Sequence, residues 1–213
     1  VFTALLGGIV SSTATTATLA RWAGQTPGWR PLAAAGAALA CAAMFARMAA
    51  LVAIAAPGIG WDPVVIFVAM AAAGGVLGTF LAARSPADDL PELQLGNPLQ
   101  LRSALQFAAF LAAVMLAGRF LADRFGDAGV MLTAAASGLV DVDAITLSIG
   151  RLVTEGAVTA ASATLALFIA ASVNQVTKLV LLMSLAGRAL AWRVLPSYAA
   201  MAAAGFAVAL GLT

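Results

Sequence analysis

The feature that most constrains this chain is a series of apolar runs, each close to the length of a membrane-spanning helix. About 20 apolar residues cross the hydrocarbon core of a bilayer as an α-helix, and lipid offers the backbone no hydrogen-bond partners. The runs lack the alternating pattern of barrel strands. The sequence therefore predicts an all-α, polytopic membrane bundle of about seven transmembrane helices, at 1–20, 32–56, 63–83, 99–118, 129–150, 157–186 and 195–213.

Composition supports a membrane protein and excludes several other classes. Hydrophobic residues make up 63% of the chain and charged residues only 9%, whereas roughly a quarter of a soluble domain is charged. One cysteine and no histidine exclude an internal disulfide and the usual zinc sites. No catalytic or nucleotide-binding motif is present. We therefore expect no enzyme activity, no nucleic-acid partner, and at most a bound cation such as Mg²⁺ or Na⁺ as cofactor.

Two segments match without a gap at an offset of 130 residues. GIVSSTATTATLAR (8–21) and GLVDVDAITLSIGR (138–151) share the residues at 8/138, 10/140, 14/144, 16/146 and 21/151. The match predicts an internal repeat, with a first copy at 1–84, a linker loop at 85–98 and a second copy at 99–213. The first copy would lack its first helix, so we expect a further segment upstream. Four spans per copy is an even number, which predicts that the two repeats run parallel across the bilayer.

Two aspartates lie near the centre of the predicted span 129–150. A central aspartate costs roughly 2.5–3.5 kcal/mol on insertion scales, so Asp141 and Asp143 are candidates for function. Side chains at i and i+2 do not share a helix face. Either only one of the two aspartates faces the bundle interior, or the backbone is unwound there. Ser137-Gly138 favours a break, and Asp141 or Asp143 would then be the N-cap of the half-helix that follows.

The first copy places hydroxyl residues where the second has these aspartates. Ser11 and Thr13 stand at the equivalent positions and are also good N-caps. The sequence thus predicts two helices broken near the midplane, whose polar groups form an ion or substrate site. Close packing of helices is the alternative role for such hydroxyls. The candidate ion ligands are Ser11, Ser12, Thr13, Thr16, Asp141, Asp143, Thr146 and Asn174, with Asp141 and Asp143 as metal ligands.

Two cations are predicted deep within apolar helices. Arg47 lies within 32–56, and Lys178 lies within 157–186 on one polar stripe with Asn174. An isolated charge is costly at this depth, so each must pair or line water. They could act as counter-charges or gating residues for a transported ion. The alternative is a structural network in which they neutralise the two aspartates.

The loops give weaker indications. Counting seven spans places Arg151 on one side of the membrane and Arg119 on the other, and the arginines divide too evenly to fix an orientation. Glu155 stands four residues after Arg151, which predicts a surface pair.

Four motifs together resemble a known membrane domain. GGIVSSTATTATLAR (7–21), NPLQLRSALQF (97–107), SGLVDVDAITLSIGRL (137–152) and SVNQVTKLVL (172–181) are similar to the C-terminal membrane domain, of unknown function, of MgtC/SapB-type proteins. The resemblance implies a multi-pass protein of a bacterial or archaeal inner membrane, with an MgtC-like segment upstream. It also implies an association with magnesium, but no catalytic residue carries over from the MgtC half.

Three functions fit these observations. The first is a membrane transport protein for a cation, either divalent or proton-coupled, with the lipid bilayer and a small inorganic ion as partners. The second is a non-transporting regulatory or scaffold domain that binds another membrane protein or a second copy. The third is an anion carrier in which Arg47 and Lys178 are ligands.

Overall fold

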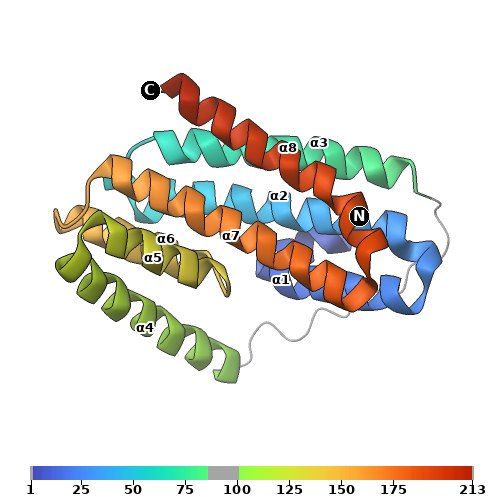
Figure 1. The fold of residues 1–213 in the computed structure, drawn as a ribbon, viewed down its shortest axis with the longest axis horizontal. Helices are drawn as coiled ribbons and strands as arrows, with labels where there is room; N and C mark the ends of the chain where they lie inside the picture. The colour runs from blue at the N-terminus through green and yellow to red at the C-terminus, as the bar shows by residue number, and fades with distance from the viewer. Residues whose placement is uncertain (1, 86–100, 213) are drawn as a thin grey trace. The chain divides into compact units, whose positions relative to one another are not determined.

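The computed structural model describes residues 2–85 and 101–212, and these residues confirm the predicted all-α class (Figure 1). The predicted linker at 85–98 lies outside the described residues except for Ser85. The helices are α1 (Phe2–Gln25), η1 (Pro27–Trp29), α2 (Arg30–Ala55), η2 (Pro57–Ile59), α3 (Asp62–Ala83), α4 (Leu101–Phe125), α5 (Asp127–Gly138), α6 (Asp143–Thr154), α7 (Ala160–Ala186) and α8 (Arg188–Leu212).

The chain folds into two compact units, which we describe separately. Unit 1 contains Val1–Arg47, Ile66–Gly96 and Gln175–Thr213, and unit 2 contains Met48–Val65 and Asn97–Asn174. Helices α2, α3 and α7 each contribute residues to both units. These units differ from the two repeats predicted from the sequence, at 1–84 and 99–213, and the division into repeats stays a prediction.

Four helices among the described residues are long and apolar enough to cross a membrane. They comprise Pro27–Ala55, Asp62–Ala83, Ala160–Ala186 and Arg188–Leu212. By length and composition, these helices are compatible with a multi-pass membrane protein. Seven spans are not confirmed among the described residues, and the predicted span 129–150 consists instead of two helices of 12 residues each.

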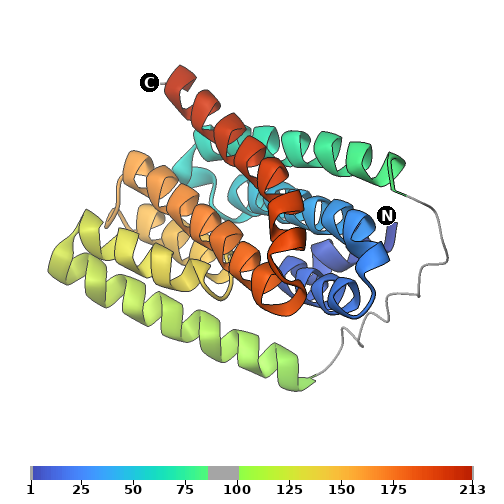
Figure 2. The same ribbon diagram turned by 45° about the vertical axis from the view of Figure 1, so that its right-hand side comes forward.

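Helices α5 and α6 form a hairpin that folds back on itself, which we call hairpin 2 (127–154). At the start of α5, Asp127 accepts a hydrogen bond from Ser162 at the start of α7. Beyond the end of α6, Glu155 pairs with Arg119 near the end of α4. One straight helix would separate residues 127 and 155 by about 42 Å. Figures 1 and 2 show α5 and α6 side by side against α4, so the prediction that 129–150 spans the membrane is wrong.

Helix α1 folds back in the same way, forming hairpin 1 (2–25). Its backbone is extended at Ser11, where φ is −159° and ψ is 105°. A Cβ placed on Gly36 of α2 would lie 3.4 Å from the Ala4 Cβ and 2.8 Å from the Leu19 Cδ1. In a continuous helix, residues 4 and 19 would be about 22 Å apart. Both arms of α1 therefore pack against the same point of α2.

Within unit 1, α2 and α7 run antiparallel. Lys178 of α7 contacts Cys41 in the middle of α2. Further along α7, Leu185 packs against Gly24, a few residues before α2 begins. These two helices correspond at the offset of 130, so their antiparallel course does not support the predicted parallel orientation of the repeats, which is not confirmed. A hairpin returns to the side it entered and contributes no crossing, which changes the count of spans on which that orientation was based.

Counting 129–150 as a spanning helix also explains why the sequence placed Arg119 and Arg151 on opposite sides of the membrane. Arg119 and Arg151 both bind the Glu155 carboxylate, at 2.6 and 2.9 Å. They therefore lie at the same end of unit 2, and the predicted assignment is wrong. The predicted surface pair of Arg151 with Glu155 is confirmed.

Candidate ion site at two helical hairpins

The tip of hairpin 2 is built around the Asp141 side chain. Asp141 Oδ1 accepts hydrogen bonds from the backbone N–H groups of Asp143, at 2.8 Å, and Ala144, at 3.2 Å. These groups belong to the first turn of α6 and have no partner inside the helix, so the carboxylate caps it. Ser137 Oγ donates to the Asp141 carbonyl across the break. The predicted break and its aspartate cap are both present.

Asn174 brings a buried amide from the middle of α7 to this tip. Its side chain is 2% exposed, and Nδ2 donates to the Gly138 carbonyl, the last residue of α5, at 2.9 Å. A carbonyl oxygen can only accept, so the amide nitrogen must face it. Asn174 Oδ1 is consequently a buried acceptor that has no hydrogen-bond partner among the described residues. Leaving such an acceptor unfilled costs about 1–3 kcal/mol.

Hairpin 1 repeats the capping arrangement with a hydroxyl group. Ser11 Oγ accepts a hydrogen bond from the Ala14 N–H at 3.3 Å. Thr16 Oγ1 then donates to the Ser12 carbonyl at 2.7 Å, and in hairpin 2 Thr146 Oγ1 donates to the Val142 carbonyl at the same distance. Both threonines are fully buried, Ser12 is 4% exposed and Thr13 is half-buried.

The interior of unit 1 also holds a buried lysine. Lys178 is 0% exposed, and its Nζ lies 3.0 Å from Met44 Sδ and 4.0 Å from Cys41 Sγ. Cys41 lies next to Ala40, against which Gly8 of hairpin 1 packs. Methionine and cysteine sulfurs are weak acceptors, so these two contacts are weak hydrogen bonds. Arg47 lies one turn beyond Met44 on α2 and is half-buried.

Two further polar residues of unit 1 escaped the sequence analysis. Gln175 is 4% exposed and donates to the Tyr198 carbonyl and to Met201 Sδ, each near 3.5 Å. The Tyr198 hydroxyl bonds to Thr16 and to the Ala37 carbonyl. Gln175 is adjacent to Asn174, and Tyr198 is the chain's single tyrosine, so a residue-type search alone would have found both.

The structure thus groups the predicted site residues into two sets. Hairpin 1 and Lys178 belong to unit 1, and hairpin 2 with Asn174 belongs to unit 2. Within its own unit, each set is tied together by the contacts described above. A single site that joins both sets stays a prediction, as does pairing between the buried cations and the aspartates.

The described residues form an all-helical protein whose long apolar helices are compatible with several membrane spans. Residues 1–187 match the family described as "Domain of unknown function (DUF4010)", and the chain belongs to this family. This confirms the predicted membership of a family of unknown function, but it does not connect the chain to MgtC/SapB proteins.

The chain also matches part of an individual protein. The chain is 29% identical over 86 residues to an uncharacterized protein of Aquifex aeolicus (strain VF5). The match covers 40% of this chain and 37% of the relative, so the chain spans little more than a third of that protein's length. No solved structure matches the chain.

Proposed function

We propose that this protein transports a small cation across a membrane and that the tip of hairpin 2 binds the ion. The observation that carries the proposal is the unfilled, buried oxygen of Asn174 at that tip. A helix interrupted inside a membrane leaves backbone groups without partners, and proteins tolerate this only where the break is buried or lines a polar cavity. Discontinuous helices of this kind hold ions in transporter folds.

The charges at the tip favour a cation over an anion. The C-terminus of α5 and the N-terminus of α6 meet there, and their partial charges, about −0.5 and +0.5, offset one another. The Asp141 carboxylate then adds negative charge to the tip. The described residues contain no cluster of three or more His, Cys, Asp or Glu side chains, so neutral oxygens such as Asn174 Oδ1 must supply most ligands. The candidate ions are Na⁺, H⁺ and hydrated Mg²⁺.

We also propose that the two hairpins belong to repeats of inverted orientation. Three contacts recur at the offset of 130. The cap of Ser11 on Ala14 matches that of Asp141 on Ala144, and the bond of Thr16 to Ser12 matches that of Thr146 to Val142. Gly8 packs on Ala40 as Gly138 packs on Ala170.

This recurrence supports a common origin of the two hairpins, and the antiparallel course of α2 and α7 supports inversion. Inverted repeats allow a transporter to open to either side in turn. Consistent with this function, we propose that the protein lies in a bacterial or archaeal inner membrane. We also propose that its partners are the bilayer and a small ion, and that it has no enzyme activity. A functional link to magnesium and to MgtC/SapB proteins belongs to the same proposal.

Ion flux into liposomes tests the function directly. The protein is reconstituted and exposed to gradients of Na⁺, H⁺, Mg²⁺ and Mn²⁺. We expect flux of one of these ions, and we expect Asp141→Asn to abolish it while leaving the fold intact, because an asparagine oxygen can still cap α6. Asp62→Asn, which neutralises an exposed aspartate at the start of α3, is the matched control.

Absence of flux for all four ions in the wild type would overturn the proposal. Equal flux in wild type and Asp141→Asn would show that the transported ion does not bind at the tip of hairpin 2. If Asp141→Asn unfolds the protein and the wild type transports nothing, the scaffold hypothesis is favoured instead.

A further inference from the structure

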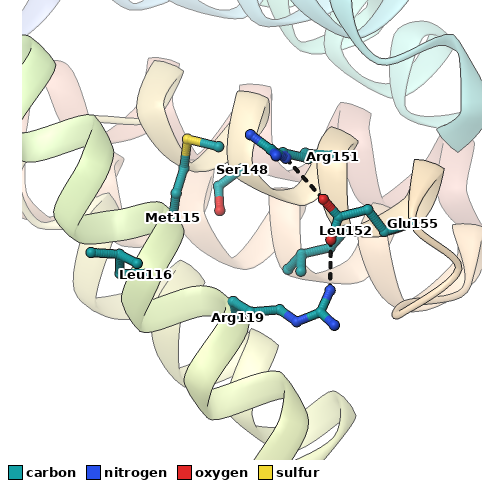
Figure 3. Close-up of a pocket in the computed structure, with 7 residues that line it drawn as sticks. All are labelled: Met115, Leu116, Arg119, Ser148, Arg151, Leu152 and Glu155. Atoms are coloured by element: carbon teal, nitrogen blue, oxygen red, sulfur yellow. Dashed lines mark hydrogen bonds and ion pairs between the residues drawn. The ribbon is translucent and has the colours of Figure 1, made fainter.

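Unit 1 is strongly basic. Its described residues contain six arginines and one lysine but no aspartate or glutamate. Two arginines of unit 2, by contrast, have a carboxylate between them. Figure 3 shows Arg119 and Arg151 on either side of Glu155 at the open end of hairpin 2, where α5 begins and α6 ends. The described part of unit 1 offers its arginines no such partner. The acidic residues of the linker, which lie outside the described residues, are Asp88, Asp89 and Glu92.

Five of the six arginines lie at one end of unit 1. Gly24, near the end of α1, packs against the Leu185 carbonyl near the end of α7. Gly78 packs on Leu39, so the end of α3 lies beside the start of α2. The ends of α1, α3 and α7 therefore meet the starts of α2 and α8. The arginines in or next to these helix ends are Arg21, Arg30, Arg84, Arg188 and Arg193.

The charge distribution along unit 1 indicates which side of a membrane this end faces. Away from the arginine end, neither 66–83 of α3 nor 194–212 of α8 contains a charged residue. Cytoplasmic ends of membrane helices carry the excess of arginine and lysine. By this rule the arginine end faces the cytoplasm, where the membrane surface is anionic. Tryptophans, which favour the membrane interface, lie at the same end at positions 22, 29 and 192.

A groove of about 260 Å³ opens between α7 and α8 at the arginine end. Arg188, the first residue of α8, is exposed and lies where the groove meets the membrane surface. The groove continues along both helices to Leu179 and Leu195, about 10 Å deeper. Met183 and Trp192 lie between these levels and are 46% and 64% exposed. The wall below Arg188 is therefore apolar and faces lipid in a bilayer.

We propose that this groove binds one anionic phospholipid of the cytoplasmic leaflet. The Arg188 guanidinium holds the phosphate group, because arginine donates paired, charge-assisted hydrogen bonds to phosphate oxygens. An acyl chain lies along Met183, Leu179 and Leu195. Basic pockets between membrane helices on the cytoplasmic side bind anionic headgroups in this way. The inference requires the protein to lie in a membrane, as proposed above, but it does not require ion transport.

The test measures how many phosphatidylglycerol and phosphatidylcholine molecules the purified full chain retains, by native mass spectrometry, after equilibration with equal amounts of each lipid. The wild type is expected to retain phosphatidylglycerol preferentially. Arg188→Gln is expected to reduce this retention about tenfold, because it removes charge-assisted hydrogen bonds. Arg193→Gln removes the same charge from an exposed position of α8 outside the groove. It is the matched control and should resemble wild type.

A second variant tests the apolar part of the groove without changing its charge. Ala191 lines the groove between Arg188 and Leu195, so Ala191→Phe fills the space that the acyl chain would occupy. This variant is expected to lose phosphatidylglycerol as Arg188→Gln does. Thermal unfolding in detergent shows whether each variant is folded.

Four results would overturn the proposal. Equal retention of the two lipids by the wild type would show that the groove does not select an anionic lipid. Equal losses in Arg188→Gln and Arg193→Gln would show a general attraction of headgroups to the arginine end. Unchanged retention in a folded Ala191→Phe would show that no acyl chain enters the groove. Displacement of the lipid by millimolar inorganic phosphate would assign Arg188 to free phosphate. The expected lipid pattern in a protein that transports no ion would overturn the proposed function alone.

Discussion

The two hairpins share one backbone design but differ in charge at their tips. Ser11 caps hairpin 1 with a neutral hydroxyl, and Asp141 caps hairpin 2 with a carboxylate. The serine shows that the break needs only an acceptor and not a charge. A carboxylate inside a membrane costs several kcal/mol more than a hydroxyl. Since capping alone does not need the charge of Asp141, we propose that this charge serves cation binding.

The largest expected effect concerns the close packing that the hairpins share. A Cβ at Gly138 would lie 2.4 Å from the Ala170 carbonyl oxygen, and one at Gly8 would lie 2.6 Å from Ala40 Cα. Backbone atoms cannot move aside as side chains can, so Gly138→Val and Gly8→Val should each destabilise the protein by about 3 kcal/mol or more.

Thermal unfolding in detergent, followed by circular dichroism, measures this effect. Gly75→Val is the control, because a Cβ there meets nothing within 4 Å. An unfolding temperature for Gly138→Val equal to that of the control would show that the arms do not pack as described.

Exchanging the two caps sharpens the comparison of the hairpins. Asp141→Ser gives hairpin 2 the cap of hairpin 1 and should change stability by about 1 kcal/mol or less, since both residues are good caps. It should nevertheless abolish cation flux in liposomes. If Asp141→Ser unfolded the protein while Asp141→Asn did not, capping geometry rather than charge would distinguish the tips.

A smaller effect is expected from the two threonines behind the tips. Thr16→Val and Thr146→Val each remove a hydrogen bond to the carbonyl four residues earlier, worth about 0.5–1.5 kcal/mol. Thr16→Val should cost more, because Thr16 also bonds to Tyr198. Chemical denaturation of both variants, beside the half-buried control Thr164→Val, measures the difference, and equal losses would contradict it.

The smallest expected effect is a pH dependence at the open end of hairpin 2. The hydrogen bond from Arg151, followed by the charges of Arg151 and Arg119, lowers the pKa of Glu155 below its ordinary value of 4.5. A carboxyl whose pKa is lower in the folded state stabilises the fold above the unfolded value, and the benefit is lost as pH falls through the lowered pKa. Glu155→Gln should remove this acid sensitivity, measured as the change in unfolding temperature between about pH 6 and about pH 3. An unchanged profile in the variant would mean that the pair does not contribute.

The break positions were predictable from sequence, but the direction of the chain after each break was not. Ser137-Gly138 and the aspartates that follow indicate a helix end and an N-cap, which are local effects. Folding back depends on contacts far apart in the sequence, such as Asp127 with Ser162. A hairpin and a spanning helix have the same apolar composition, so the sequence counted 129–150 as a span, and neither the seven spans nor the parallel repeats are confirmed.

The role of the buried Asn174 amide also depends on a contact that is distant in the sequence. Asn174 was a candidate because it is polar at depth, but its role depends on which way the amide faces. That orientation is fixed by the Gly138 carbonyl, 36 residues away. No local pattern contains this information.

The most direct test of the account is the sidedness of hairpin 2. Asp127→Cys and Glu155→Cys are labelled in oriented membrane vesicles with a membrane-impermeant maleimide, in a chain where the native Cys41 is replaced by alanine. Gly28→Cys, in η1 just before α2, and Ala55→Cys, at the end of α2, calibrate the two sides. Because hairpin 2 folds back on itself, positions 127 and 155 are expected to be labelled from the same side. Labelling from opposite sides would show that 129–150 crosses the membrane and would contradict the hairpin on which the ion site depends.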